Sequence, residues 1–493
     1  MQIQTIMSRK MQKKFSHKKV RITSLMLAVL IFTAACALLT ACNKTNQHAL
    51  DTSPCYDINM EYDMDTATIA ATQEILYTAS DNLDCIVLHI YANSFAKDNS
   101  AIDILSAQID KQTVEYEIYG EDRTLLKLPC ALRKDDSVIM TFKYTVSLAH
   151  SDTRLGVTEQ GNANLTCFYP VVAKYDGGWR EDCYTQFGDP FFCDTSSFYV
   201  RLTVDEGLSV ATSGKVTDTQ YATKGGKDKK ILEIEAENIR DFGMAVGKFE
   251  SLSESVNIGG RKVEVNYFYY SDSEPAESLS RAMKSITVFS EAFGDYPHST
   301  FTVVQSNLAS AGGMEYGAFV LVSPTESRAD YLDTITHETA HQWWYNAVGS
   351  DQLNSAWLDE GLTEFCTYYY YYLVGDRTMF TSAMQSISRS YSAFSALKPT
   401  VGFDGRMNRH LTTYLTEGEY VAVTYYKGAL LFDTLHTLVG DKKFQAAMKC
   451  YFERNKYSIA TQAELVSAFK AQGYNMESIV SGWTNDTAPL QFT

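Results

Sequence analysis

Two histidines and two glutamates between residues 337 and 360 have the types and the spacing of a metal site. His337 and His341 are four residues apart, so on a helix both imidazoles project from one face, about one turn apart. Glu360 follows His341 after eighteen residues, in the segment W-L-D-E-G-L-T-E-F, which is expected to form a second helix. Two imidazoles and one carboxylate leave the fourth position of a zinc ion open for water, which is typical of a catalytic site.

Glu338 follows the first histidine directly, too close to it in sequence to bind the same ion comfortably from the same face. Its carboxylate is well placed to act on a metal-bound water, so Glu338 is predicted to be the general base. A bare H-E-x-x-H also occurs by chance on ordinary helices. The prediction of one zinc ion per chain therefore depends on Glu360 in the second segment.

The frame around Glu360, with Trp357, Leu358, Asp359 and Gly361, resembles the zinc aminopeptidases of family M1 in the gluzincin group. Aminopeptidase N and leukotriene hydrolase are relatives in that family. The resemblance extends over residues 56–490, and it implies hydrolysis of the N-terminal peptide bond of peptides that have a free N-terminus. It also implies a saddle-like N-terminal domain and a thermolysin-like catalytic domain.

A glycine-rich segment before the histidines, G-G-M-E-Y-G, resembles the G-x-M-E-N edge strand of the family. The resemblance implies that Gly312, Gly313 and Met314 line the substrate and that Glu315 pairs with its α-amine. A buried carboxylate is costly unless it meets a cation, which an ammonium supplies. Tyr316 stands where the family usually has asparagine, so the shape of the first side-chain pocket stays open. A glycine-rich turn with an incidental glutamate is the alternative.

The segment Y-Y-K-G-A resembles the family's Y-x-K-G-A, in which the first tyrosine donates a hydrogen bond to the oxyanion. That role is assigned to Tyr425 and not to Tyr426. Tyr420 also matches a family tyrosine near the site, although packing explains it equally well. Glu364, one turn after Glu360, could orient His337 from behind the metal ligands.

Two other functions remain open at this stage. One is a zinc endopeptidase on the same chemistry, in which Glu315 no longer reads an amine. The other is a surface binding module without enzymatic activity, which a metal assay would separate from both peptidases. Only 68 residues follow Tyr425, fewer than in many relatives, so a more open cleft is expected.

Composition and charge describe a globular protein that does not bind nucleic acid. The chain has 493 residues, of which 45% are hydrophobic, enough for two or three cores. The formal net charge is −16, and residues 1–41 carry seven basic side chains and no acidic one, which leaves −23 on the rest. Such an acidic surface argues against nucleic acid as a partner.

The N-terminus is predicted to be a bacterial lipoprotein signal peptide over residues 1–41. Basic residues precede an apolar run from Ile22 to Ala41, and Leu39-Thr40-Ala41-Cys42 resembles a lipobox. We expect lipid on Cys42 to hold the protein on the cell membrane, outside the cytoplasm. Residues 42–54 are expected to be a flexible tether. An uncleaved transmembrane anchor is the alternative.

Eight cysteines lie beyond the lipobox, and export would permit disulfides. Their pairing cannot be deduced from the sequence, because eight cysteines allow 105 connectivities. Cys183 with Cys193 is the only pair that we would suggest. Buried free thiols are the alternative, and the preferred one for Cys366.

Hydrophobic patterning divides the remainder into two domains. Residues 55–252 alternate with the period of strands, as at 84–91, 138–146 and 198–204, and predict an antiparallel β domain. Residues 253–493 are predicted to form the catalytic domain with a helical lobe. It should begin with a strand at 262–270 and a helix at 275–293, which has proline in its first turn and Gly294 past its end. Strands at 301–305 and 319–322 should follow, and then the zinc helix from near Asp330.

Overall fold

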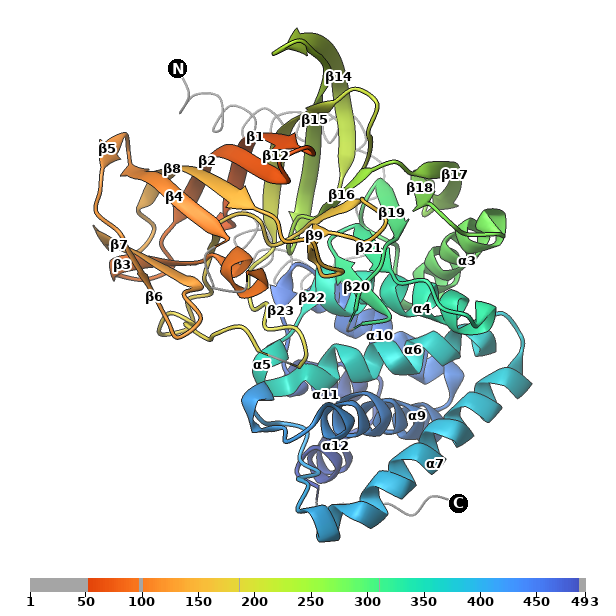
Figure 1. The fold of residues 1–493 in the computed structure, drawn as a ribbon. Coiled ribbons are helices and arrows are strands. Elements are labelled where there is room, and N and C mark those ends of the chain that lie inside the picture. The colour runs from red at the N-terminus through yellow and green to blue at the C-terminus, as the bar shows by residue number, and fades with distance from the viewer. Residues whose placement is uncertain (1–51, 97–100, 186, 310, 487–493) are drawn as a thin grey trace, which may run out of the picture.

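The structure is a computed structural model that describes residues 52–96, 101–185, 187–309 and 311–486. Figure 1 shows β-sheets in the upper part of the molecule and helices in the lower part. The segments that carry the predicted metal ligands lie where the two parts meet. This confirms the predicted class, a β domain followed by an α+β domain.

The first part is almost entirely strands. Its elements are β1 (Cys55–Asp63), β2 (Thr68–Thr78), β3 (Leu83–His89), the 3-10 helix η1 (Tyr91–Phe95), β4 (Ile102–Ile109), β5 (Gln112–Thr113), β6 (Glu117–Tyr119), β7 (Leu125–Leu132), β8 (Ser137–Ser147), β9 (Leu155–Val157), β10 (Ala163–Leu165), β11 (Val171–Val172), β12 (Ser196–Asp205), β13 (Ser209–Thr212), β14 (Lys215–Lys224), β15 (Lys227–Ile239) and β16 (Met244–Gly247).

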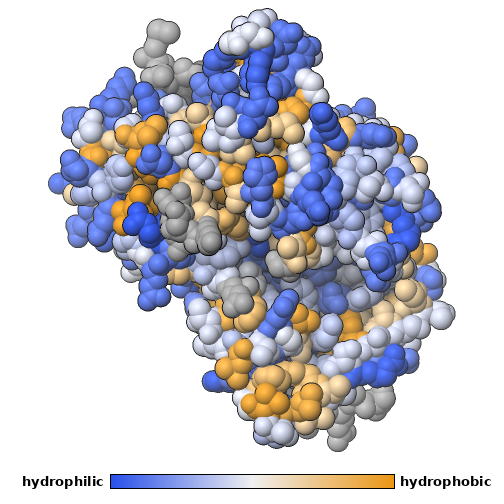
Figure 2. Space-filling model, in the orientation of Figure 1, coloured by the Kyte–Doolittle hydropathy of each residue, from blue (hydrophilic) through white to orange (hydrophobic). Residues whose placement is uncertain are grey.

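These strands form one large and two small sheets within the described residues. The orders are β14-β15-β12-β1-β2-β8-β4-β5, β13-β16-β10-β9 and β11-β3-β7-β6. Pairing is antiparallel except between β1 and β12, which run parallel. The hairpin of β14 and β15 projects from the molecule, and Figure 2 shows that its tip is mostly hydrophilic on this face. The strands predicted at 84–91, 138–146 and 198–204 correspond to β3, β8 and β12.

A five-stranded sheet opens the second part, in the order β17-β18-β19-β21-β20. Its strands are β17 (Glu250–Ile258), β18 (Arg261–Tyr269), β19 (Thr300–Gln305), β20 (Gly313–Tyr316) and β21 (Phe319–Val322). The expected domain boundary at 252 falls inside β17. β20 is the edge strand, and it pairs antiparallel with β21. Within the described residues the outer edge of β20 therefore pairs with no other strand.

Helices make up the rest of the second part. They are α3 (Pro275–Phe293), α4 (Arg328–His341), the π-helix η2 (Gln342–Ala347), α5 (Gln352–Ser355), the 3-10 helix η3 (Ala356–Leu358), α6 (Glu360–Leu373), α7 (Arg377–Val401), the 3-10 helix η4 (Leu411–Thr413), α8 (Glu417–Val421), the π-helix η5 (Ala422–Tyr426), α9 (Lys427–Val439), α10 (Asp441–Asn455), α11 (Gln462–Ala471) and α12 (Glu477–Thr484). Short strands β22 (Val348–Gly349) and β23 (Ser458–Ile459) pair in parallel.

Each part has its own apolar core. The core of the second part includes Trp343, Trp344 and Trp357, all nearly inaccessible to water, and it surrounds α4 and α6. The core of the first part is built from the inward-facing residues of its sheets, such as Tyr56 and Phe142. The metal-ligand helices are therefore fixed by burial on the side away from the cleft.

The suggested pairing of Cys183 with Cys193 is wrong, because both are free thiols in the structure. The Cys193 thiol is buried and donates a hydrogen bond to the carbonyl oxygen of Arg240, 3.3 Å away. Cys366, which was expected to be a buried free thiol, is one. The predicted signal peptide, the lipobox with Cys42 and most of the tether lie outside the described residues. Among the described residues, no helix is long and apolar enough to cross a membrane.

Candidate active site

Helices α4 and α6 bring the three predicted metal ligands together. The side chain of Ser327 caps α4 by accepting a hydrogen bond from the backbone N–H of Asp330. At the other end of this helix the His337 and His341 rings are 4.9 Å apart between centroids. Glu360 opens α6, and its Oε2 lies 3.4 Å from His337 Nε2 and 3.3 Å from His341 Nε2. The ligand atoms of the three residues all lie within 4.8 Å of one another.

The outer nitrogens of both imidazoles have partners, which fixes the rings. His341 Nδ1 is 2.7 Å from the buried carboxylate of Asp359. His337 Nδ1 is 3.0 Å from the hydroxyl of Thr367, which donates its own hydrogen to the carbonyl oxygen of Thr363. Each Nδ1 therefore carries a hydrogen, which leaves each Nε2 as the nitrogen that faces Glu360 and could bind a metal ion. Glu364, the residue expected to orient His337, lies further from Nδ1, at 3.4 Å.

The charges of the cluster depend on one another. Burial opposes ionisation of Glu360, but His341 and His337 outweigh it and hold the pKa of this carboxyl well below its usual range. Burial also opposes protonation of His337, but Glu360 and Glu364 raise its pKa to about 9. A buried carboxylate and two imidazoles directed at one point attract a cation. Their donor set fits zinc with one position left open.

Glu338 faces the same space without joining this ligand set. It is 4% exposed, and its Oε2 has no hydrogen-bond partner. Burial raises the pKa of Glu338 to about 7, although the charges of His337 and His341 act to lower it. Strand β20 passes so close that a Cβ on Gly313 would lie 2.3 Å from Glu338 Oε1. Glycine at 313 is thus required by this close approach.

Glu315 projects from β20 into the same cavity as Glu338 and His341. It is 5% exposed, and its carboxylate lies within 4.8 Å of ligand atoms of those two residues. Burial, and next the nearby charge of Asp189, raises the pKa of Glu315 well above its usual value. Gly312, Gly313 and Met314 also line this cavity, as the sequence led us to expect. A cation that enters this cavity would therefore meet the desolvated carboxylate of Glu315.

Tyr425 lies beside the metal ligands, on the π-helix η5. Its ring stacks on the His337 ring, with centroids 6.1 Å apart and 13° between planes. Burial comes first in raising the pKa of Tyr425 well above its usual value, and Glu360 adds to it, so the phenol keeps its hydrogen. Helix α9 packs so tightly on α6 that a Cβ on Gly428 would lie 2.6 Å from the Cα of Gly361. These two glycines set how near Tyr425 comes to the metal ligands.

The cavity has a volume of about 640 Å³. Its lining includes the predicted ligands His337, His341 and Glu360, together with Glu338 and Tyr425. The structure thus brings together every residue that the sequence assigned to the site.

Comparison with known proteins agrees with this geometry. The family model described as "Peptidase family M1 domain" matches residues 277–483, which include both predicted metal segments, the edge strand and Tyr425. The curated protein "Aminopeptidase M1-B" of Oryza sativa subsp. japonica is 22% identical over 455 residues. The "Aminopeptidase N" of Lactobacillus delbrueckii subsp. lactis is 22% identical over 411 residues. Residues 277–483 of this chain thus match the domain of peptidase family M1.

The curated relatives are longer proteins. The alignments cover 87% and 77% of this chain but only 49% and 45% of the rice and Lactobacillus proteins. The chain thus spans about half the length of the curated relatives that it matches.

Solved structures share the fold over almost their whole length. The M1 zinc metallopeptidase from Deinococcus radiodurans has a TM-score of 0.66 at 18% identity, and covers 89% of this chain and 95% of its own. A variant of a two-domain M1 zinc metallopeptidase bound to L-arginine has a TM-score of 0.65 at 20% identity, over 88% and 94%. At this identity the likeness establishes the fold alone, which has two domains.

The first domain contributes a wall of the cavity that sequence reasoning missed. Arg154 Nη1 lies 2.7 Å from Asp189 Oδ1, and both side chains are buried. Tyr184 and Phe187 line the cavity beside them. Nothing in the spacing of these residues connects them to the metal segments, because they meet only through the packing of the two domains.

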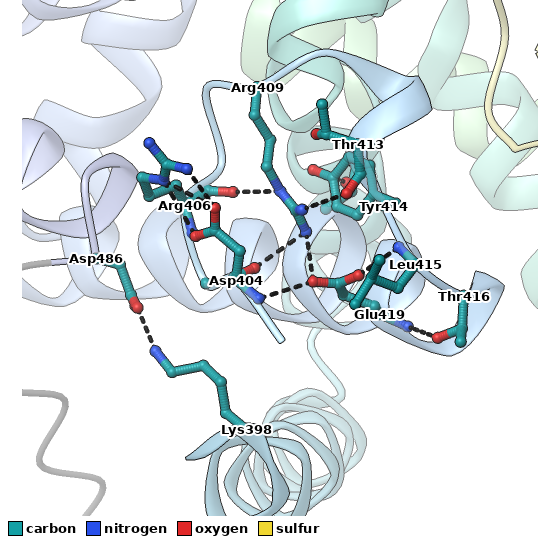
Figure 3. Close-up of polar contacts among 12 residues, drawn as sticks. Lys398, Asp404, Arg406, Arg409, Thr413, Tyr414, Leu415, Thr416, Glu419 and Asp486 are labelled. Atoms are coloured by element: carbon teal, nitrogen blue, oxygen red, sulfur yellow. Dashed lines mark hydrogen bonds and ion pairs between the residues drawn. The ribbon is translucent and has the colours of Figure 1, made fainter. Parts of the chain in front are cut away.

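The helix that precedes Tyr425 is held by a buried ion pair, shown in Figure 3. Glu419, at 0% side-chain exposure, lies 2.9 Å from Arg409 Nη2. It also accepts hydrogen bonds from the backbone N–H groups of Asp404 and Leu415, at 2.8 and 2.6 Å. Arg409 in turn lies over the ring of Tyr414, 3.6 Å from its centroid.

Tyr420 follows Glu419 on this helix and packs against Tyr425. The two rings meet edge to face, with centroids 5.8 Å apart. The Tyr420 hydroxyl is buried without a hydrogen-bond partner, and the side chain lines the cavity. The sequence left open whether Tyr420 serves the site or only the packing. Its unpaired hydroxyl inside the cavity is not explained by packing alone.

Tyr316, the departure from the family pattern, turns away from the cleft. Its hydroxyl accepts a hydrogen bond from Thr166 at 2.9 Å, and its ring packs against Phe319. It lines a separate cavity of about 30 Å³ between the domains. The side chain at this position thus contributes to the domain contact behind β20.

Proposed function

We propose that this chain is a zinc-dependent aminopeptidase that hydrolyses the N-terminal peptide bond of peptides. The observation that carries the proposal is the shared cavity: the buried carboxylate of Glu315 lies beside Glu338 and His341, which itself lies beside Glu360. A substrate whose ammonium is bound at Glu315 then presents its first peptide bond to the metal site.

The residues at the site divide the reaction between them. His337, His341 and Glu360 would hold the zinc, which supplies Lewis-acid chemistry toward the scissile carbonyl and the attacking water when bound. Glu338 takes the proton of that water at its free Oε2 and passes it to the leaving amine.

Two further groups recognise charge on the substrate. The hydroxyl of Tyr425 donates a hydrogen bond to the oxyanion that develops at the carbonyl, which a neutral phenol does without a counter-charge. Glu315 binds the α-ammonium and so restricts cleavage to the first bond. Gly312, Gly313 and Met314 provide the edge at which the substrate backbone lies.

A panel of aminoacyl-fluorophore substrates tests this function. We expect hydrolysis that is lost on treatment with a zinc chelator and restored by about one equivalent of Zn²⁺. Hydrolysis that persists without bound metal would contradict the zinc chemistry. A chain that binds no zinc and hydrolyses none of the substrates would support the binding module instead.

We also propose that the protein is a lipoprotein, held on the outer side of the cell membrane by lipid on Cys42. The basic residues, the apolar run and the lipobox of residues 1–42 support this. Cys42→Ala should abolish labelling with a fatty-acid analogue, because the thiol is the acceptor. Equal labelling of the variant and the wild type would favour a transmembrane anchor.

A further inference from the structure

The turn that follows Glu315 is held in an unusual conformation. β20 ends at Tyr316, and Gly317 and Ala318 connect it to β21. Ala318 has φ of 56°, in the left-handed region that residues other than glycine adopt at a cost in free energy. Such a conformation persists only where the surroundings fix it, so the groups that bind this turn decide where β20 lies.

Gln342 binds the turn at two points. Its Nε2 donates a hydrogen bond to the carbonyl oxygen of Tyr316 at 2.9 Å. Its Oε1 accepts one from the N–H of Ala318, also at 2.9 Å. The side chain is 0% exposed, so no water competes for either bond.

Because of its position in the chain, Gln342 joins the two parts of the site through these two bonds. Gln342 directly follows His341, and Tyr316 directly follows Glu315. The side-chain amide of Gln342, the residue after the ligand His341, therefore binds the backbone of Tyr316, the residue after Glu315. A change in this connection alters the distance between Glu315 and the metal ligands.

The first domain binds the same turn from its other side. Asp241 accepts a hydrogen bond from the N–H of Gly317 at 3.0 Å and one from the hydroxyl of Tyr345 at 2.7 Å. Tyr345 belongs to η2, the π-helix that begins at Gln342. A Cβ on Gly317 would lie 2.4 Å from the side chain of Ile239, so no larger residue fits. The turn is thus fixed between the metal helix and the domain interface.

We propose that Gln342 is a positioning residue that sets the register of Glu315 against the metal site, and thereby confines cleavage to the first peptide bond. This inference rests on the proposed aminopeptidase function. According to this proposal, a residue that does not touch the substrate contributes to the exopeptidase selectivity. Asp241 supports the same register from the first domain.

Gln342→Met tests the proposal, because methionine nearly matches glutamine in shape and makes neither bond. Each protein is assayed on a peptide with a free N-terminus and on the same peptide acetylated there. We expect kcat/KM on the free peptide to fall on the order of tenfold to a hundredfold, since a displacement of about 1 Å has effects of this size. The acetylated peptide should lose less than about threefold. Metal content should be unchanged.

Trp343→Phe is the matched control. Trp343 follows Gln342 directly, is equally buried, and donates one hydrogen bond, to the carbonyl oxygen of Gly294 at 2.9 Å. Its removal should lower thermal stability and leave the ratio of the two kcat/KM values unchanged. A merely structural role of Gln342 would give the same result as this control.

A second variant and a second measurement secure the test. Gln342→Glu keeps the acceptor for Ala318 and loses the donor to Tyr316, so it should show the same selective loss to a smaller degree if Gln342→Met does not fold. In a Glu338→Gln background, which prevents turnover, calorimetry compares leucinamide with N-acetylleucinamide. The Gln342 variant should weaken binding of leucinamide alone.

The outcomes separate the two proposals. A wild type that prefers free N-termini, with a Gln342→Met variant that prefers them equally, overturns the positioning role and leaves the aminopeptidase function standing. Equal losses on both peptides also overturn it. A wild type that cleaves both peptides alike overturns both proposals.

Discussion

The metal ligands lie between two flanks that are supported in different ways. The strand flank is β20, which carries Glu315, and it is bound by Gln342 of the metal helix and Asp241 of the first domain. The helix flank is α8 with η5, which carries Tyr425, and its support is the ion pair of Glu419 with Arg409 inside the helical lobe. The strand flank is bound by the residue that follows His341, whereas the helix flank is packed on α6 and has an ion pair of its own as a further support.

This difference predicts two kinds of defect. A change on the strand flank moves the group that reads the amine, so it should alter which peptides are chosen. A change on the helix flank moves the hydroxyl that meets the oxyanion, which every peptide substrate develops, so it should slow all substrates alike. Measuring free and acetylated peptides side by side distinguishes the two.

The largest effect should come from the base, which belongs to neither flank. Glu338→Gln removes proton transfer, and kcat should fall on the order of 10²–10⁴-fold on both kinds of peptide. Zinc should remain bound, because Glu338 lies outside the ligand set, whereas Glu360→Ala should lower zinc occupancy itself. Near-wild-type turnover by Glu338→Gln, measured with metal content, would remove Glu338 from the role of base.

The helix flank is tested next by Tyr425→Phe. Loss of the hydroxyl should lower kcat on the order of 10²–10³-fold, equally on free and acetylated peptides, because the lost bond forms with the oxyanion. Tyr426→Phe is its control, since that half-buried ring packs against the core. A larger effect at Tyr426 than at Tyr425 would reverse the assignment.

Loss of the ion pair that supports the helix flank should lower stability more than it changes turnover. Arg409→Met leaves the carboxylate of Glu419 buried without its cation, which should lower the free energy of unfolding by about 3 to 5 kcal/mol. Turnover of the folded variant should fall for both peptides, with their ratio unchanged. A shift in that ratio would show that the two flanks are coupled.

The smallest effect should come from Lys398→Met. This lysine pairs with Asp486, and its side chain is 25% exposed. Because such pairs contribute about 1 kcal/mol or less, thermal unfolding should change little and turnover should not change. A loss as large as that of Arg409→Met would mean that the whole network, and not the buried pair, supports α8.

Local signals made much of this molecule predictable. Proline at 275 and Gly294 mark both ends of α3, and glycine there adopts φ of 120° as the helix terminates. The four-residue spacing of His337 and His341 places both rings on one face once the segment is helical, and the segment was predicted to be a helix. The resemblance supplied Glu315 and Tyr425, which no local pattern identifies.

Contacts between distant segments were out of reach. Asp241 and Asp189 have no sequence spacing that connects them to Glu315, because the packing of two domains brings them together. Gln342 reaches the turn after Glu315 only through the packing of α4 and η2 on β20 inside the second domain. The cysteine pairing failed for a similar reason, since Cys193 is held by Arg240 and not by Cys183. Asp359 could have been found, because it directly precedes Glu360, and a carboxylate there is able to orient a histidine ligand.

The central claim is that Glu315 reads the ammonium of the substrate, and one double comparison tests it most directly. kcat/KM is measured for wild type and Glu315→Ala, each on a free peptide and on its N-acetylated form. Losing one partner of a buried charged pair costs about 2 to 5 kcal/mol, so wild type should prefer the free peptide by about thirtyfold to several thousandfold. Glu315→Ala should lose most of that preference and change little on the acetylated peptide. Internal cleavage of acetylated peptides by wild type, at rates that match the free ones, would contradict the account and make the protein an endopeptidase.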